Sequence, residues 1–389
     1  SEPDLQMAEE VRVKSAGAPV EGAVAAASER IFVASQWRLM WWRFRRHKAA
    51  LVSVFIIAFL YLVAVFADFL APYDPERHNT KWVYCPPQLP RVRIANGGLH
   101  FYVNEYKVSK HPVTFRSIYT PDPEKEHPIL FLVNRGRQYR LFGFIRTNIR
   151  LFGLPENSKG TLFLFGTDPL GRDMFSRVVY GIRISMSVGL VGVVITFLLG
   201  ITLGGFSGLY GGVFDTIVQR VIEVLISIPA TPLWLGLSAA IPKDWPQVRV
   251  YFSITIILSL VSWTGLARVV RGRFLSLREE DFVTAARLAG ANDRRVVFRH
   301  LVPSILSYII AQATLAIPSM IMAETALSFL GLGLRPPTIS LGVLLQEAQN
   351  VRTVALAPWL LIPGYIVILA VLCFNFMGDG LRNAADPYA

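Results

Sequence analysis

The 389-residue sequence has little charge and almost no cysteine. Charged side chains make up 17% of the chain, against 53% hydrophobic residues, which is too little charge to keep an ordinary globular protein of this size in water. The high hydrophobic content also excludes a disordered chain. The two cysteines, Cys85 and Cys373, cannot supply a disulfide framework or a four-ligand metal site. Much of the chain is therefore expected to lie in a lipid bilayer.

Sequence motifs for catalysis are missing as well. There is no G-x-x-x-x-G-K-[ST] phosphate loop, no H-E-x-x-H zinc motif and no G-x-S-x-G nucleophile elbow. The histidines between residues 71 and 165 show no close metal-ligand spacing; they are His78, His100, His111 and His127. We therefore expect this chain to be no enzyme and to hold neither a cofactor nor a metal.

The charge that is present is mostly basic, with a formal net charge of +12. A basic excess can indicate nucleic-acid binding, but in a membrane protein it is expected in cytoplasmic loops. Residues 36–48, QWRLMWWRFRRHK, lead directly into the apolar run 49–70. This pattern favours an interfacial helix before a first span over a nucleic-acid patch. Residues 1–34 are expected to form a flexible cytoplasmic tail without a secretory signal peptide.

Five further apolar segments bring the expected number of transmembrane helices to six. An even number places both termini on one side, and the arginines near residue 40 assign that side to the cytoplasm. The loop between the fourth and fifth spans carries seven arginines between residues 271 and 299, as this orientation requires. The five segments are 184–206, 213–241, 250–270, 305–327 and 358–377.

Residues 71–165 do not have the composition of a membrane span. The prolines of APYDP end the first apolar run. LHFYVNEYKV, ILFLVNRGRQYRLFGFI and TLFLF are aromatic and β-branched runs of the kind that form short strands. The sequence thus predicts an all-α polytopic membrane protein, N-in and C-in, with a small β-rich extracytoplasmic insertion between helices 1 and 2. The expected domains are 1–34, 35–70, 71–165 and a five-helix core, 166–389, which contains a cytoplasmic coupling loop at 276–303.

The cytoplasmic loop has the pattern of two short helices. Ser276 and Glu279 fit a capping box at the start of the first helix, and Gly290 fits its C-terminal end. The second helix is expected to begin near Asn292 and to end at Pro303.

One face of the first loop helix consists mostly of small side chains. Phe282, Ala285, Ala286 and Ala289 recur there at helical spacing. Such a face, ringed by arginines, suits insertion into a groove on a partner protein. An amphipathic helix lying on anionic lipid explains it equally well, so the residues alone leave both readings open.

The stretch TAARLAGANDRRVVFRHLVP resembles the EAA loop of importer permeases in the ABC transporter superfamily. That loop has a triplet, three residues, a glycine, nine residues and an Ile-x-Leu-Pro ending. Thr284 stands where the family has the glutamate of the triplet, and His300 alters the apolar ending. The resemblance implies an ATPase contact made by Phe282, Thr284, Ala285, Ala286, Gly290, His300 and Pro303.

Three more motifs resemble the C-type permease subunit of dipeptide and oligopeptide importers: APYDP, GTDPLGRDMFSRVVYGIRIS and AETALSFLGLGLRPP. The resemblance runs from Trp37 to the C-terminus, except for an insertion at about 77–162. It implies a bacterial inner-membrane protein that works with a second homologous permease, two ATPase subunits carrying ATP and Mg, and a periplasmic substrate-binding protein. Peptides are the implied substrate, although related systems carry oligosaccharides, opines or nickel chelates.

Two groups of charged residues are further candidates for functional sites. Asp168 is predicted to begin a helix and to pair with Arg172, as Asp173 pairs with Arg177, at i,i+4 spacing. The resemblance places Asp168, Arg172 and Asp173 near the docking site of the binding protein. Glu324 lies inside an apolar segment and belongs either to the translocation path or its outer gate, or to a structural pair. Asp215, Arg220 and Glu223 are expected to tie helices together.

A self-contained channel or an ion-coupled secondary transporter is the alternative. It predicts intramembrane ion ligands, broken helices or paired repeats, and only Glu223 and Glu324 approach that pattern. A membrane-anchored sensor that works through its outer domain is a third reading, which leaves the cytoplasmic loop unexplained.

Overall fold

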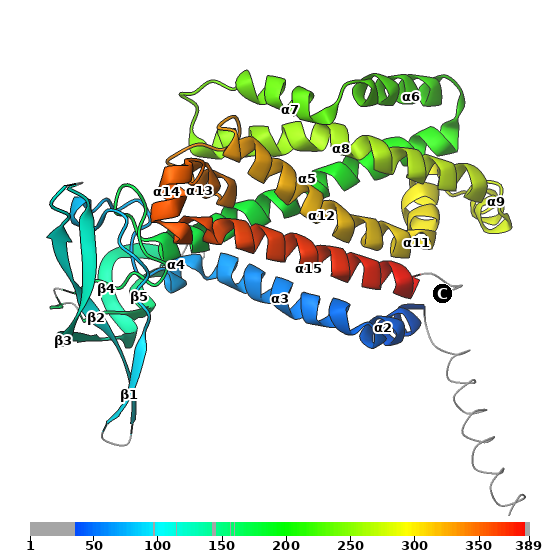
Figure 1. Cartoon of the computed structure of the whole chain (residues 1–389). Coiled ribbons are helices and arrows are strands. Elements are labelled where there is room, and N and C mark those ends of the chain that lie inside the picture. The colour runs from blue at the N-terminus through cyan, green and yellow to red at the C-terminus, as the bar shows by residue number, and fades with distance from the viewer. Residues whose placement is uncertain are drawn as a thin grey trace, which may run out of the picture.

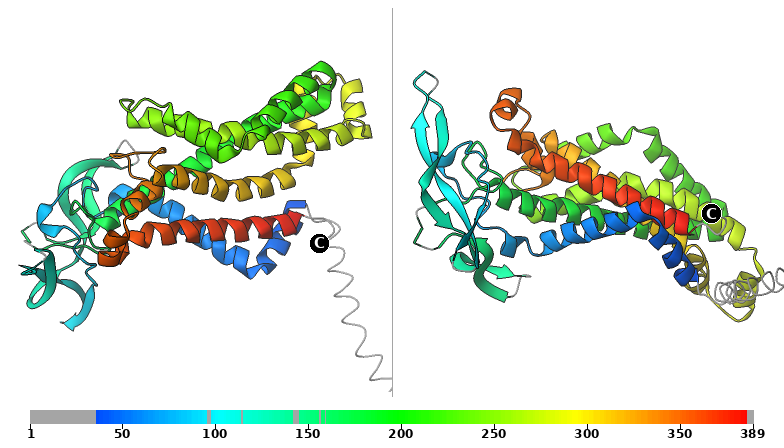
Figure 2. Two further views of the ribbon diagram at one scale, coloured as in Figure 1. Left: turned by 45° about the horizontal axis from the view of Figure 1, so that its top comes forward. Right: turned by 60° about the horizontal axis from the view of Figure 1, so that its bottom comes forward.

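The computed structural model describes residues 36–385 except 96–97, 114, 142–144, 156 and 159. The predicted tail, residues 1–34, lies outside the described residues. The helices form an elongated bundle with the strands gathered at one end and helix α9 at the other (Figures 1 and 2). We call these the β end and the α9 end.

Five helices are long and apolar enough to cross a membrane. They correspond to five of the six predicted spans, and apolar side chains on their outer faces, such as Phe55 and Phe59, are more than 60% exposed, as expected of helices that meet lipid. They are α3 (Lys48–Val65), α5 (Met174–Tyr210), α8 (Gln247–Leu277), α12 (Leu306–Phe329) and the continuous pair η3 (Pro358–Leu361) and α15 (Ile362–Ala385).

The predicted span 213–241 is broken into two helices. It consists of α6 (Gly212–Ser227) and α7 (Ala230–Ala239), which meet at 87°. Pro229 causes the break, because proline pushes the residue before it out of the helical region and Ile228 is extended, with φ −93° and ψ 126°. The described residues therefore contain five candidate spans, or six if the bent pair is one span.

The first helix, α2 (Gln36–Arg46), lies beside the end of α15 at the α9 end (Figure 1). Its Met40 and Phe44 are buried with Ala50 and Ala384. The described start of the chain and the end of its last helix therefore lie at the same end of the bundle.

Five strands form the β end, so a small β-rich region is present as predicted. β1 (Arg91–Ala95), β2 (Gly98–Lys110) and β3 (Ser117–Pro128) make one antiparallel sheet, and β4 (Leu130–Leu141) pairs with β5 (Ile145–Gly153). TLFLF, residues 161–165, is not a strand, which corrects the prediction. β3 was missed because it contains prolines, which an edge strand tolerates.

The strands are attached to the bundle near the end of the first span. Helix α4 (Ala67–Leu70) packs on β4 and β5, and the buried Arg150 donates a hydrogen bond to the carbonyl of Ala71. Phe152 of β5 meets Phe175 of α5 edge-on, with ring centroids 5.6 Å apart.

Helix α5 runs through the middle of the bundle and packs against α8, α12 and α3. Its small residues allow a close approach to α8, since a Cβ at Gly208 would come within 2.7 Å of the Arg271 carbonyl oxygen. Close backbone approach is the usual means of helix association in lipid. Two short helices, α13 (Leu341–Glu347) and α14 (Val351–Leu356), complete the β end.

Candidate functional site

The coupling loop, residues 276–303, begins later than its sequence suggests. α8 continues through Ser276 to Leu277, so the predicted capping box is wrong. The helix continues through Ser276 because Phe274, two residues earlier, is fully buried against the bundle, and tertiary packing outweighs a local cap. The first loop helix is α9 (Asp281–Leu288), preceded by Glu280 in an extended conformation.

Gly290 ends α9 as predicted. Its φ is +83°, a left-handed conformation that residues with a Cβ rarely adopt, and its N–H donates to the Arg287 carbonyl at 2.9 Å. Asn292 caps the next turn by accepting from the Arg295 N–H at 2.9 Å. The chain continues through α10 (Asp293–Arg295), a π-helical turn (Val296–Leu301) and α11 (Val302–Ser304).

The loop is fixed to the bundle by apolar side chains. Val283 of α9 is fully buried, and so is Leu301 of the π-helical turn. They pack in one cluster with Val270 and Phe274 of α8 and with Leu209 of α5. The same cluster also contains Val296 and Val297. The loop is therefore packed together with α5 and α8 around one buried apolar cluster.

The opposite face of the loop meets solvent in this chain. Leu288 is 85% exposed, Phe298 49% and Phe282 41%. The ATPase-contact candidates from the sequence lie on this side or at its margin: Phe282, Thr284, Ala285, Gly290 and Pro303 are exposed, and Ala286 and His300 are half-buried. No sequence pattern singled out Leu288, the most exposed of the apolar side chains, or Val283, the anchor.

Polar contacts tie the α9 end together. Arg271 of α8 pairs with both oxygens of Asp215 on α6, with its Nε and Nη2 each 2.5 Å from an oxygen. Asp215 thus links helices as predicted. Arg220 and Glu223 pair with each other on the exposed side of α6 alone, at 2.8 Å, so the expectation that they also join helices is wrong.

A buried ion-pair network lies at the β end, at the start of α5. Asp168 accepts from Arg172 Nε at 2.6 Å and from Arg177. Both arginines also bind Glu347 of α13, Arg172 at 2.8 Å and Arg177 at 2.6 Å. The predicted pair of Asp168 with Arg172 is present. No sequence pattern pointed to Glu347, because that contact joins segments far apart in the chain.

The cap of α5 differs from the prediction. Asp173 is the N-cap and accepts from the Ser176 N–H at 2.8 Å, while Asp168 lies in the preceding turn, and Asp173 does not pair with Arg177. Burial raises the pKa of Asp173 to about 7, against the lowering effect of the hydrogen bonds from Ser176 and with a smaller contribution from the Asp168 charge. Because Asp168 and Asp173 are buried and Arg172 is nearly so, these side chains offer little surface to a docking protein.

Glu324 of α12 is completely buried. Ser185 of α5 and Ser328 donate their hydroxyls to its two oxygens, at 2.9 and 2.8 Å. The serine oxygens in turn accept from the backbone N–H groups of Leu341 and Leu334, at 3.1 and 3.0 Å. Glu324 is therefore the centre of a polar network that joins α5, α12 and the segment before α13, which favours its structural role.

Two family profiles match the sequence. The profile described as "Binding-protein-dependent transport system inner membrane component" matches residues 200–388, and the one described as "N-terminal TM domain of oligopeptide transport permease C" matches residues 35–87. The dipeptide transport system permease protein DppC of Lactococcus lactis is 33% identical over 359 residues, which cover 90% of each chain. The chain therefore belongs to the family of binding-protein-dependent inner-membrane transport permeases.

A second relative agrees with this assignment. The oligopeptide transport system permease protein OppC of Haemophilus influenzae is 40% identical over 224 residues, covering 57% of this chain and 70% of its own. A structure titled "Inward facing conformations of the MetNI methionine ABC transporter" aligns with a TM-score of 0.42 at 18% identity, over 55% of this chain and 98% of that chain. This permease is a multi-pass membrane protein.

The two profile matches bracket the strands. Residues 88–199 lie outside both of them, and all five strands fall in that interval. The coupling loop, Glu324 and α13 lie inside the longer match, whereas Ser185, which donates to Glu324, lies outside both matches.

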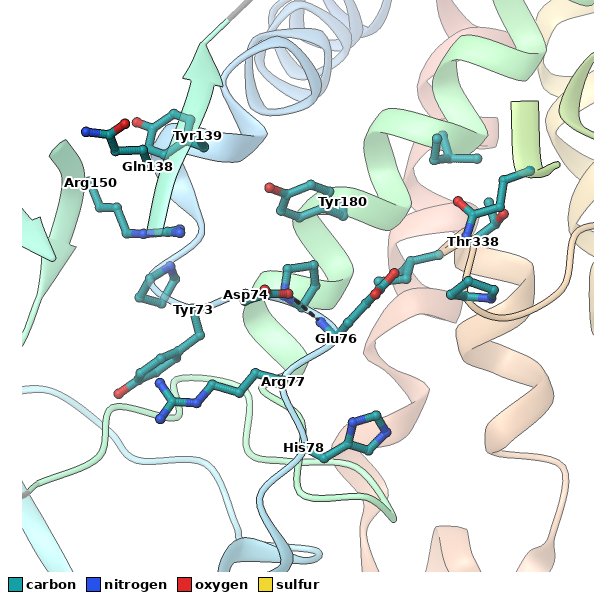
Figure 3. Close-up of a pocket in the computed structure, with 16 residues that line it drawn as sticks. Tyr73, Asp74, Glu76, Arg77, His78, Gln138, Tyr139, Arg150, Tyr180 and Thr338 are labelled. Carbon is teal, nitrogen blue, oxygen red and sulfur yellow. Dashed lines mark hydrogen bonds between the residues drawn. The ribbon is translucent and has the colours of Figure 1, made fainter. Parts of the chain in front are cut away.

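The permease has a large open cavity at the β end, of about 1030 Å³. The segment 72–78 after the first span forms one wall, β4 and β5 contribute Tyr139 and Arg150, and the loop before α13 contributes Thr338 (Figure 3). Among the described residues, no group of three His, Cys, Asp or Glu side chains could hold a metal ion.

Proposed function

We propose that this permease is the C-type transmembrane subunit of an ATP-driven importer that moves peptides across the bacterial inner membrane. The relatives whose sequences span most of the chain are dipeptide and oligopeptide permeases by name. The observation that carries the proposal is the coupling loop, which exposes Phe282 and Leu288 at the α9 end while Val283 and Leu301 fix it to the bundle.

The proposed topology has six spans, with α6 and α7 forming one bent span and both termini in the cytoplasm. The nearby ends of α2 and α15 at the α9 end support this arrangement. The arginine-rich loop then lies in the cytoplasm and the β end lies outside, in agreement with the positive-inside rule. The domain limits 35–70, 71–165 and 166–389 follow from it, with residues 1–34 as a cytoplasmic tail.

The proposed partners are a second homologous permease, two ATPase subunits and a periplasmic substrate-binding protein. ATP and Mg²⁺ bind to the ATPase subunits, and this chain holds no cofactor. The candidate contact residues of the loop, with Phe282, Thr284, Ala285, Ala286 and Gly290 at the centre and His300 and Pro303 at the margin, enter a groove on one ATPase subunit.

The contacts of the loop suggest how ATP-driven movement reaches the membrane. An ATPase that shifts α9 also shifts α8 and α5, because Val283 and Val297 belong to the same buried cluster as side chains of α8 and α5. The Arg271–Asp215 pair extends the movement to α6. Rigid-body tilting of these helices opens the path alternately to the two sides, and hydrolysis resets it.

The strand region is proposed as an additional docking surface for the binding protein. Its exposed apolar side chains, such as Leu99 of β2 and Ile94 of β1, stand at the outer end. Asp168, Arg172 and Asp173 take part by holding the start of α5 in place rather than by direct contact, and Glu324 is a structural residue beside the path.

The alternative is a self-contained channel or an ion-coupled transporter, neither of which is driven by ATP. The broken pair α6 and α7 is the feature that favours it. Glu223 is paired on the exposed side of α6 with Arg220, and Glu324 is bound by serines, so neither carboxylate is held as part of an ion site.

The experiment is purification of the tagged full chain from its own host in mild detergent, with mass spectrometry of the proteins that accompany it. Wild type is expected to bring a sister permease and an ATPase. With Leu288→Asp or Gly290→Trp, the amount of co-purified ATPase is expected to fall at least tenfold, and the sister permease is expected to be retained.

Leu99→Asp is the matched control, because it places the same charge on an exposed leucine at the opposite end. It should keep both partners. A wild-type chain that purified alone and carried solute without ATP would overturn the proposal.

A further inference from the structure

A second, smaller cavity adjoins the large one at the β end. It holds about 100 Å³ between the turn that joins α7 to α8 and the loop that joins α12 to α13. The two cavities share Gln247, Pro337 and Thr338 in their walls. The two cavities are therefore neighbours that share one wall.

The small cavity is cationic. Lys243 and Arg335 line it, and no acidic side chain does. Neither cation has a carboxylate within salt-bridge distance among the residues that the structure describes. Arg335 is held in place, because its Nε donates to the Gly331 carbonyl at 3.2 Å. The exposed Lys243 and the half-buried Arg335 thus line one partly open cavity without a countercharge.

A buried hydroxyl in the same wall also lacks a hydrogen bond. Ser238 of α7 is 1% exposed, and its Oγ has no hydrogen-bond partner among the described residues. Buried polar groups are nearly always paired, and leaving one unpaired is costly. A ligand oxygen in this cavity would accept from the Ser238 hydroxyl and from both cations.

These donors suit a carboxylate in particular. A guanidinium binds the two oxygens of a carboxylate in a planar, forked geometry, and the lysine adds a compact positive charge. Trp245 forms an apolar side of the cavity and carries Arg249 over its ring at 5.1 Å from the centroid. The site therefore offers charge, hydrogen-bond donors and an apolar surface together.

The adjoining large cavity has the opposite charge in part of its wall. Asp74 and Glu76 line it together with Arg77 and Arg150, and Figure 3 shows Glu76 directed toward Thr338, which both cavities share. The volume of about 1030 Å³ is at the upper end of the range for small-ligand pockets. A molecule with a carboxylate at one end and an ammonium group at the other matches this distribution.

We propose that Ser238, Lys243 and Arg335 form a subsite for the terminal carboxylate of a transported peptide, with Asp74 and Glu76 facing its amino end. The peptide binds here on entering the permease from the β end. This assignment rests on the proposed function, since it takes the substrate to be a peptide.

The test uses the complete importer complex in nanodiscs of phosphatidylcholine and a tripeptide with a central benzoylphenylalanine as photo-crosslinker. Uptake of the same peptide into proteoliposomes is measured in parallel. The free acid is expected to crosslink to residues 238–245 or 332–338, and its C-terminal amide at least tenfold less. Lys243→Gln with Arg335→Gln should lower the yield with the free acid at least tenfold.

Two variants separate charge from structure. Lys243→Arg with Arg335→Lys keeps both charges and should keep at least half of the yield. Asp244→Asn changes the neighbouring charge, which does not line the cavity, and should change nothing.

The outcomes distinguish the subsite from the function. Uptake with equal crosslinking of acid and amide, or with crosslinks elsewhere, would overturn the subsite and leave the peptide importer standing. No uptake of any peptide would overturn the proposed function and the subsite with it. Loss of the crosslink in phosphatidylglycerol nanodiscs, with lipid retained in its place, would identify a lipid phosphate as the occupant and contradict the peptide assignment.

Discussion

Arg177 of α5 binds Glu347 of α13 through two hydrogen bonds, Nη1 to Oε2 at 2.6 Å and Nη2 to Oε1 at 2.9 Å, although 170 residues separate them. Arg177 is 1% exposed. A buried cation needs such partners, because removing one carboxylate leaves charge in a medium of low polarity. The pair fastens α13 to the start of α5.

Glu347→Ala should therefore destabilise the permease. Asp168 remains beside Arg177, so we expect a loss of about 2–3 kcal/mol, somewhat less than for a buried pair left without any compensation. The measurement is the thermal unfolding midpoint in detergent. Glu223→Ala breaks the exposed pair with Arg220 and should change stability by less than about 0.5 kcal/mol; equal effects of the two variants would contradict the assignment.

Substitutions of Glu324 should separate its structural role from a role in the path. Glu324→Gln keeps an acceptor oxygen for Ser185 or Ser328 and should leave both stability and transport near wild type. Glu324→Leu removes both acceptors and should cost about 2 kcal/mol, seen as a lower unfolding midpoint. A Gln variant that folded normally but transported at least tenfold more slowly would instead place Glu324 in the translocation path.

Gly290 and Gly272 provide a matched pair for the coupling loop. A Cβ at either position would meet nothing within 4 Å, but Gly290 has a φ of +83° and Gly272 is helical. Gly290→Ala should cost about 1 kcal/mol through backbone strain alone, whereas Gly272→Ala should be neutral or stabilise by up to about 1 kcal/mol. Unfolding midpoints of the two variants decide this, and a loss in both would point to packing rather than conformation.

Stability should depend on pH through Asp173. Its pKa rises from 3.8 to about 7 on folding, mainly because of burial, so the folded state binds more protons between those values. The stabilising effect of protonation is complete below about pH 4 and is lost as the pH rises through 7. The unfolding midpoint of wild type should fall between pH 5 and pH 8 relative to Asp173→Asn, a variant that retains an N-cap. If the unfolding midpoints of wild type and Asp173→Asn changed with pH in parallel, a group other than Asp173 would be responsible for the pH dependence.

Much of the bundle could be predicted from the sequence because its signals are local. A run of about 20 apolar residues indicates a span wherever it occurs. Gly290 ends a helix because glycine readily adopts the left-handed backbone conformation found there. The sites depended on distant contacts. Periodicity placed Phe282 and the alanines on one face of α9, but only packing against α8 showed that Val283 is the buried anchor.

The sequence by itself determined that this chain lies in a membrane, where its apolar runs are, and which loop carries the family motif, since composition and spacing do not depend on the rest of the fold. The tertiary structure decided which charges meet. It joined Arg177 to Glu347, enclosed Glu324 among serines, and left Lys243 and Arg335 around one cavity without an acid. A side chain of one sign can pair with any of many opposite charges, and only the folded backbone selects among them.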